Sequence, residues 1–198
     1  MRVYRISDIL DSEMRRLLLL GLVALIAGCG SGSDLYPLRV GAKWDYQVRT
    51  ALARSVSAFK VTGRAPIAGE YGYVIESDMG KSILVWKSGQ LLASRLGGTR
   101  FSPPIPILVE DEIKNGITTK TSIEFGGTKE DGVAILTQAS DKLTIEGKES
   151  SVIRATVILQ TPSREVRTIS TYAPGKGLIQ QQQLTDGRFD LSLDRLDQ

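Results

Sequence analysis

The thiol of Cys29 stands out among the groups that could do chemistry, because it belongs to the only cysteine in 198 residues and the chain has no histidine. A Ser-His-Asp triad, a Cys-His dyad and a His-ligated metal site all require histidine, so the sequence excludes them. A disulfide within the chain or a Cys-rich zinc site requires further cysteines, so both are excluded as well. What is left for Cys29 is covalent modification of a single thiol.

Acids and serines are the remaining candidates for catalysis. Glu110-Asp111-Glu112 could supply the carboxylate pair of a glycosidase, although acids this close together are more typical of a solvated turn. A Ser-Lys nucleophile would need Ser-x-x-Lys in a suitable setting, and no convincing instance occurs. We therefore expect a non-enzyme without metal or cofactor, with a carboxylate- or Ser/Lys-based envelope hydrolase as the minor alternative.

The residues before Cys29 have the layout of a secretory signal. Residues 14–16 are Met-Arg-Arg, residues 17–26 form an apolar run that only Gly21 interrupts, and Ala27-Gly28 are small. Charge, apolar stretch and small residues in this order are typical of a signal peptide. The apolar run has about ten residues, whereas a membrane-spanning helix needs roughly twenty.

Ile26-Ala27-Gly28-Cys29 then resembles the lipobox of bacterial lipoproteins. In such proteins the cysteine thiol receives a diacylglyceryl group, the peptide is cut between Gly28 and Cys29, and the new amino group can be acylated. The resemblance implies residues 1–28 as signal peptide, lipidation at Cys29 and no cofactor besides this lipid. Residues 1–13 place acids ahead of the cationic segment, so we expect Met14 as the true start.

The resemblance also implies where the protein acts. Several acyl chains anchor durably, since each buried methylene adds about 0.8 kcal/mol. Residues 29–35 are expected to be the lipidated cysteine and a flexible Gly/Ser tether, which spans on the order of 12 Å. Gly30 stands where Asp would indicate retention at the inner membrane. We expect an extracytoplasmic protein anchored to the cell membrane or to the inner leaflet of the outer membrane.

Residues 36–198 are predicted to form one all-β, mostly antiparallel domain. Segments such as 44–48 and 82–86 combine alternation or apolar runs with β-branched and aromatic residues. Ser88-Gly89 and Asp186-Gly187 are hairpin signals. We expect a single curved sheet, a half-barrel or a barrel-like domain after an N-terminal signal helix, with the open, closed and sandwich forms left as alternatives.

Three local expectations concern where strands end. A turn near Ser140-Asp141 would separate a strand at 133–136 from one at 142–145. The run Pro103-Pro104-Ile105-Pro106 is expected to be a stiff crossover between two groups of strands. Gln180 to Gln183 is expected to be an exposed edge to which a partner strand could add.

Trp44 and Tyr46 are the candidate binding residues outside the signal, because residues two apart on a strand share a face. The pattern of residues 36–46, Tyr-Pro-Leu, a Gly, then Trp and Tyr, resembles the start of β-rich envelope lipoproteins, and residues 172–179 resemble their closing motif. The resemblance implies a β-rich envelope domain without known catalytic residues. We expect Trp44 to plug one end of the core, with an aromatic sugar- or lipid-binding face as the alternative.

The predicted function is that of a non-enzymatic lipoprotein, a binding or assembly factor at the membrane surface. The alternative is a carrier or sensor that holds a lipid or another hydrophobic ligand in a half-barrel groove, which a continuous apolar cavity would favour. Expected partners are the membrane, through the anchor, and another envelope protein or a lipid. Nucleic acid is not expected, because the net charge is only +3 and the basic residues are scattered.

Overall fold

Antiparallel strands make up almost all of the described chain. The computed structural model describes residues 34–111, 113 and 115–196, which belong to the folded unit Gly32–Gln198. Gly28 and Cys29, with the whole predicted signal peptide, lie outside the described residues. Among the residues that are described, no helix has the length and hydropathy needed to cross a membrane.

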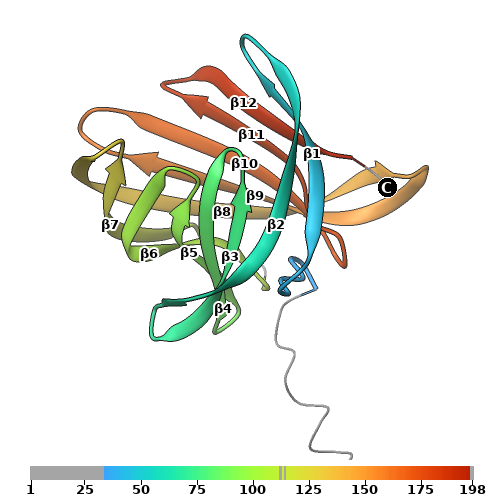
Figure 1. The fold of residues 1–198 in the computed structure, drawn as a ribbon, viewed down its shortest axis with the longest axis horizontal. Coiled ribbons are helices and arrows are strands. Elements are labelled where there is room, and N and C mark those ends of the chain that lie inside the picture. Colours follow the sequence, from blue (N-terminus) through green and yellow to red (C-terminus); the bar gives the residue numbers. More distant parts are fainter. Residues whose placement is uncertain (1–33, 112, 114, 197–198) are drawn as a thin grey trace, which may run out of the picture. The chain divides into compact units, whose positions relative to one another are not determined.

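Twelve strands form one closed sheet in the described part of the chain (Figure 1). Their bounds are β1 Lys43–Thr50, β2 Arg54–Ile67, β3 Glu70–Ser77, β4 Gly80–Lys87, β5 Gln90–Leu96, β6 Thr99–Val109, β7 Ile117–Phe125, β8 Thr128–Ile145, β9 Lys148–Gln160, β10 Glu165–Ala173, β11 Gly177–Thr185 and β12 Arg188–Arg195. Each strand pairs antiparallel with its sequence neighbours, and β12 pairs with β1. The predicted all-β antiparallel fold is confirmed, and of the three forms left open the chain adopts the closed barrel.

Two-residue turns set the register of several hairpins. Ser88-Gly89 (φ 49° and 72°) and Asp186-Gly187 (φ 49° and 74°) have positive φ at both positions, as a type I′ turn requires. The twist of such turns matches that of the flanking strands, so no extra residues are needed. Both predicted hairpins are confirmed. The same pattern occurs at Ala68-Gly69, Gly126-Gly127 and Glu146-Gly147.

The predicted turn near Ser140-Asp141 is wrong. Strand β8 continues through this point, where Asp141 pairs with Val152 of β9, and the Asp141 carboxylate lies 2.7 Å from the Arg154 guanidinium. Neither residue has positive φ, and the chain turns at Glu146-Gly147 instead. The long β8–β9 hairpin is visible at the right of Figure 1.

The predicted crossover at residues 103–106 is also wrong, because these residues lie within β6. The prolines nevertheless interrupt the sheet on one side, since they lack the N–H that a ladder needs. The β6–β7 ladder covers only Thr99–Ser102 of β6. Near the end of β6, the side-chain amide of Gln138 accepts from Val109 N at 3.1 Å and donates to Val109 O at 3.0 Å. The Gln138 side chain, which belongs to β8, thus takes the place of a backbone strand partner for Val109.

The turns define two ends of the barrel. We call the end with the β1–β2, β3–β4, β5–β6, β7–β8, β9–β10 and β11–β12 turns the mouth end, because a cavity described below opens there. The other end, where residues 34–42 approach β1, is called the plugged end. The fully buried large side chains lie mainly toward the plugged end, among them Tyr46, Leu84, Leu91, Ile105, Leu108 and Leu136. The barrel is therefore filled at one end only.

Candidate functional site

Aromatic rings close the plugged end. Tyr36 lies between Trp44 and Tyr172, with ring centroids 5.5 Å and 5.8 Å apart and tilted ring planes. The indole N–H of Trp86 donates to Tyr36 O at 3.2 Å, which fixes the segment that enters β1. Tilted and edge-on ring pairs of this kind add about 0.5–1.5 kcal/mol beyond the apolar area that they bury. We refer to Tyr36, Trp44 and Tyr172 as the aromatic plug.

Trp44 and Tyr46, the predicted binding residues, are both buried in this core. The ring of Tyr46 packs edge-on against Phe59 at 5.0 Å, and its hydroxyl donates to Leu178 O at 2.8 Å. Burial raises the pKa of the Tyr46 phenol, since the charged form would be desolvated. Trp44 is part of the plug, at the position expected from the sequence. A sugar- or lipid-binding role of this aromatic pair stays a prediction.

Above the plug the barrel contains a cavity of about 270 Å³. Its floor is formed by Tyr36, Tyr172 and Leu178, and it extends to the Gly97-Gly98 turn at the mouth end. Its wall is largely apolar, with side chains from six strands, namely Phe59, Ile75, Leu84, Ile107, Val157, Leu159, Leu191 and Leu193. Inward-facing apolar side chains do not fill the whole interior, in contrast to a packed core.

The cavity continues into a second hollow of about 350 Å³ at the mouth. Six residues line both spaces, namely Leu96, Thr99, Phe125, Leu159, Thr168 and Gln183. The two spaces are thus parts of one channel that runs from the aromatic plug to the solvent. Half-buried Leu159 stands where they meet.

One wall of the channel is polar. In the β10–β11 ladder Thr168 pairs with Gln183 and Ser170 pairs with Gln181, and all four residues line the cavity. The predicted exposed edge at Gln180 to Gln183 is therefore wrong, because β11 is paired on both sides, with β10 and β12. Alternate glutamines point in opposite directions, so Gln180 and Gln182 are exposed while their neighbours face the channel.

Charged side chains surround the mouth. The Arg164 guanidinium lies over the Phe125 ring, 5.3 Å from its centroid, which is within the roughly 6 Å of a cation–π contact. The Glu130 carboxylate accepts from the Ser163 hydroxyl at 2.7 and 2.8 Å. Asp190 accepts from the Gln183 amide at 2.6 Å. Hydrogen bonds from Thr161 and Ser163 lower the pKa of Glu130, so this carboxyl stays ionised near neutral pH.

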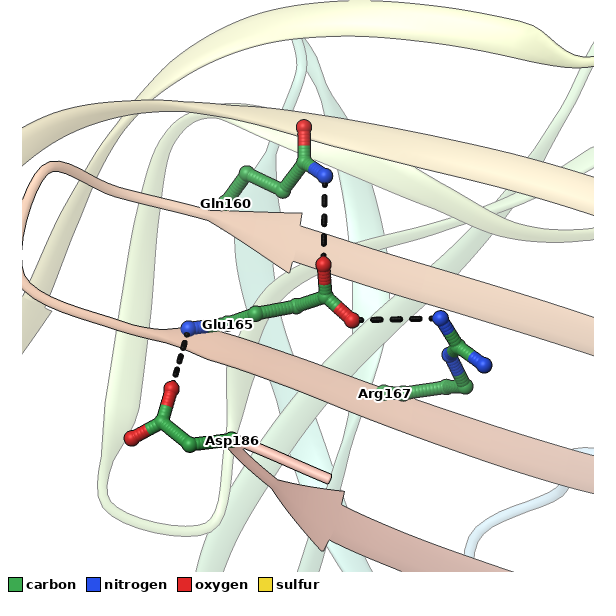
Figure 2. A network of polar contacts seen from close by, with 4 residues as sticks. All are labelled: Gln160, Glu165, Arg167 and Asp186. Carbon is green, nitrogen blue, oxygen red and sulfur yellow. Dashed lines mark hydrogen bonds and ion pairs between the residues drawn. The ribbon is translucent and has the colours of Figure 1, made fainter.

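A polar network fastens two hairpins of the mouth end to each other (Figure 2). The Glu165 carboxylate accepts from Gln160 and from Arg167, each at 3.2 Å. The backbone N–H of Glu165 donates to the Asp186 carboxylate at 2.9 Å, and Asp186 N donates to Glu165 O at 2.8 Å. The β9–β10 and β11–β12 turns are thereby held side by side next to the polar wall.

Other sequence candidates do not converge on the channel. Glu110 and Asp111 follow β6 at the plugged end and are exposed. Within the described residues, no group of three or more acidic side chains lies close enough together to hold a metal ion. Thr168 and Ser170 were missed from the sequence, and Gln181 and Gln183 were predicted only as part of an exposed edge. In each strand the two polar residues are two positions apart, which predicts that they share a face. That the two pairs face the same side follows only from the β10–β11 register.

Comparison with known proteins gives a likeness in fold. No protein-family model matches the chain, and no curated protein matches its sequence. A proposed lipoprotein from Parabacteroides distasonis has a crystal structure with TM-score 0.47 and 10% identity, over 82% of this chain and 97% of that one. A proposed exported protein with a YmcC-like fold from Bacteroides fragilis has TM-score 0.48 and 10% identity, over 83% and 98%. At this identity the chain resembles both in fold, and no ligand or activity follows from the likeness.

Proposed function

We propose that the protein is a lipid-anchored envelope protein that binds an apolar or amphipathic ligand inside its barrel and catalyses no reaction. The observation that carries the proposal is the continuous channel above the aromatic plug. Ligand sites are commonly apolar cavities of about 300–1,000 Å³ with a few polar groups, and the mouths of barrels are frequent places for them. The cavity and the mouth hollow together fall in this class.

The mouth contains two acids, Glu130 and Asp190, so catalysis by a carboxylate pair has to be weighed. A general acid works with a raised pKa, which keeps its proton near neutral pH. Hydrogen bonds lower the pKa of Glu130, which is the opposite change. Asp190 is engaged by the Gln183 amide at 2.6 Å. Both carboxylates serve as acceptors that organise the mouth, and we therefore favour binding over hydrolysis.

The lipobox resemblance and the fold together suggest an orientation. Cys29 precedes Asp34 by five residues, and Asp34 O accepts a hydrogen bond from Gly175 N at 2.7 Å, at the plugged end. From its Gly/Ser composition, a segment of this length is expected to span on the order of 12 Å. A lipid on Cys29 would hold the plugged end at the membrane surface, and the mouth would face away from that membrane.

Filling the channel is expected to abolish ligand binding while leaving the fold intact. Leu159→Trp places an indole at the junction of cavity and mouth. We expect at least a tenfold loss of affinity for the neutral fluorophore phenylnaphthylamine, measured by fluorescence titration. The matched control is Ile158→Trp, on the opposite face of β9, which should bind as the wild type does. Absence of probe binding to the wild type, with no lipid in native mass spectra of the membrane-extracted protein, would overturn the proposal.

Lipidation is tested at its single thiol. In cells given labelled fatty acid, Cys29→Ser should take up no label and should retain the signal peptide, because serine cannot form the thioether. The control is Ser31→Ala, which keeps the thiol and changes the tether by one hydroxyl. Mass spectrometry and membrane fractionation provide the readout. A Cys29→Ser protein with unchanged mass and unchanged membrane retention contradicts the anchor, and it does so independently of ligand binding.

Exposed apolar side chains at the mouth end favour a second candidate function, that of a factor that contacts another envelope protein. Of the eight large exposed apolar residues among those that the structure describes, five lie at or near mouth-end turns, namely Leu52, Val56, Met79, Phe125 and Phe189. Leu52 is 98% exposed. Scattered exposed apolar residues are common, but their concentration around a ligand channel is suited to contact with a partner. If the channel binds no probe, this candidate becomes the preferred one.

A further inference from the structure

The polar wall of the channel has hydrogen-bonding groups that the protein itself does not use. The Gln181 carbonyl oxygen accepts from the Ser170 hydroxyl at 3.4 Å, but the Gln181 amide nitrogen has no partner among the described residues. The Thr168 hydroxyl likewise has none within the described part of the chain. Both side chains line the cavity. Neither donor is a fully buried atom without a partner, so a ligand oxygen can take the place of water as the acceptor for each of them.

The register places these two groups next to each other. Thr168 pairs with Gln183, and Gln181 is two residues before Gln183 on β11, so Thr168 and Gln181 are diagonal neighbours about 7 Å apart. Two donors at this spacing suit two oxygens of one acylated glycerol, namely the ester carbonyl and a neighbouring hydroxyl. The opposite wall offers Phe59, Ile75 and Leu84, which suit an alkyl chain.

The charges at the mouth restrict the headgroup. Two carboxylates, of Glu130 and Asp190, line the mouth, against one guanidinium, of Arg164. Arg164 already lies over the Phe125 ring. An anionic headgroup would meet more negative than positive charge, and like charges brought together at an interface are unfavourable. A neutral or zwitterionic headgroup avoids this repulsion.

We propose that the ligand is a neutral or zwitterionic amphiphile whose acyl chain lies against the apolar wall and whose ester carbonyl and neighbouring hydroxyl are bound by Gln181 and Thr168. This assignment rests on the proposed function and adds the ligand class. It predicts that the channel distinguishes among molecules of equal chain length. A monoacylglycerol and a lysophosphatidylcholine should bind more tightly than the free fatty acid, and an alkane without oxygen should bind least.

The test is displacement of phenylnaphthylamine by these four compounds. For the wild type we expect a monoacylglycerol affinity about tenfold above that of the fatty acid at neutral pH. Gln181→Leu should lower the monoacylglycerol affinity about five- to tenfold, the usual effect of one lost hydrogen bond, and should not lower alkane affinity, because leucine keeps the wall apolar. Gln182→Leu, on the exposed face of β11, is the matched control and should change neither affinity.

A second variant guards against a folding defect in the first. Thr168→Val keeps the shape of the side chain and removes its hydroxyl, and it should lower ester affinity in the same direction as Gln181→Leu. If both variants bind monoacylglycerol as tightly as the wild type, or if the fatty acid binds best, the ligand class is overturned while the channel function stands. If no compound displaces the probe from the wild type because the probe never binds, the proposed function itself fails.

Discussion

Gly177→Ala is expected to lower the free energy of unfolding by about 2–5 kcal/mol, the sum of a backbone and a packing effect. Gly177 has φ +82°, a conformation in which a side chain is strained. A Cβ at this position would also lie 2.6 Å from Cδ2 of Tyr36. The Tyr36 ring has little freedom to move away, because Trp44 and Tyr172 lie against it at 5.5 and 5.8 Å. The substitution therefore disturbs the aromatic plug directly.

The matched control for this experiment is Gly175→Ala in the same turn. Gly175 has a similar φ of +74°, but a Cβ there meets nothing within 4 Å. Its expected loss is about 1–2 kcal/mol, the cost of the left-handed conformation alone. Denaturant unfolding of the two variants gives both values. Equal losses would show that the plug adapts to the extra methyl group and is not rigidly packed.

The local parts of the fold could be predicted from the sequence because they depend on local chemistry. Asp186-Gly187 and Ser88-Gly89 form tight hairpins since glycine and short polar residues accept positive φ. Ser140-Asp141 carries a similar polar composition, yet β8 runs through it. There, pairing with β9 and the contact between Asp141 and Arg154 outweigh the local turn preference. The local composition of a segment therefore does not predict whether a partner strand will pair with it.

Closure of the barrel and the existence of the channel could not be predicted in this way. The closing contact pairs Tyr46 of β1 with Arg195 of β12, far apart in the sequence, and nothing local specifies it. Hairpins with β10 and β12 already make β11 an inner strand, and closure turns the side on which Gln181 and Gln183 lie into the wall of a cavity. The candidate site thus depends on one long-range pairing. The packing of Trp44 could be predicted from the sequence, because an aromatic residue at the start of a strand is expected in the core of an open sheet, a closed barrel or a sandwich.

The second large effect is expected in alkaline solution, where stability should fall steeply above pH 10. Tyr36, Tyr46 and Tyr172 are buried, and desolvation raises the pKa of each phenol above its ordinary value of 10.0, that of Tyr172 to about 12. Above pH 10 the unfolded chain releases these protons while the folded chain keeps them. The unfolded state then binds fewer protons, so stability decreases as pH rises. Each tyrosine contributes about 1.4 kcal/mol per pH unit, and the three together roughly 4 kcal/mol per unit.

Single Tyr→Phe variants can separate the contribution of each phenol to the pH dependence of the unfolding free energy. Tyr172→Phe removes one of the three phenols, so it should reduce the slope of unfolding free energy against pH by about a third between pH 10 and 12, the range set by the ordinary and raised pKa values. At pH 8 the same variant should show no slope, because no phenol ionises in either state. Tyr46→Phe should reduce the slope similarly but also destabilise at pH 8, since Leu178 O loses the hydroxyl that donates to it at 2.8 Å. Tyrosinate absorbance provides an independent readout. If all the phenols ionise together at the pH of free tyrosine while the protein remains folded, solvent reaches the floor of the channel and the plug does not seal the barrel.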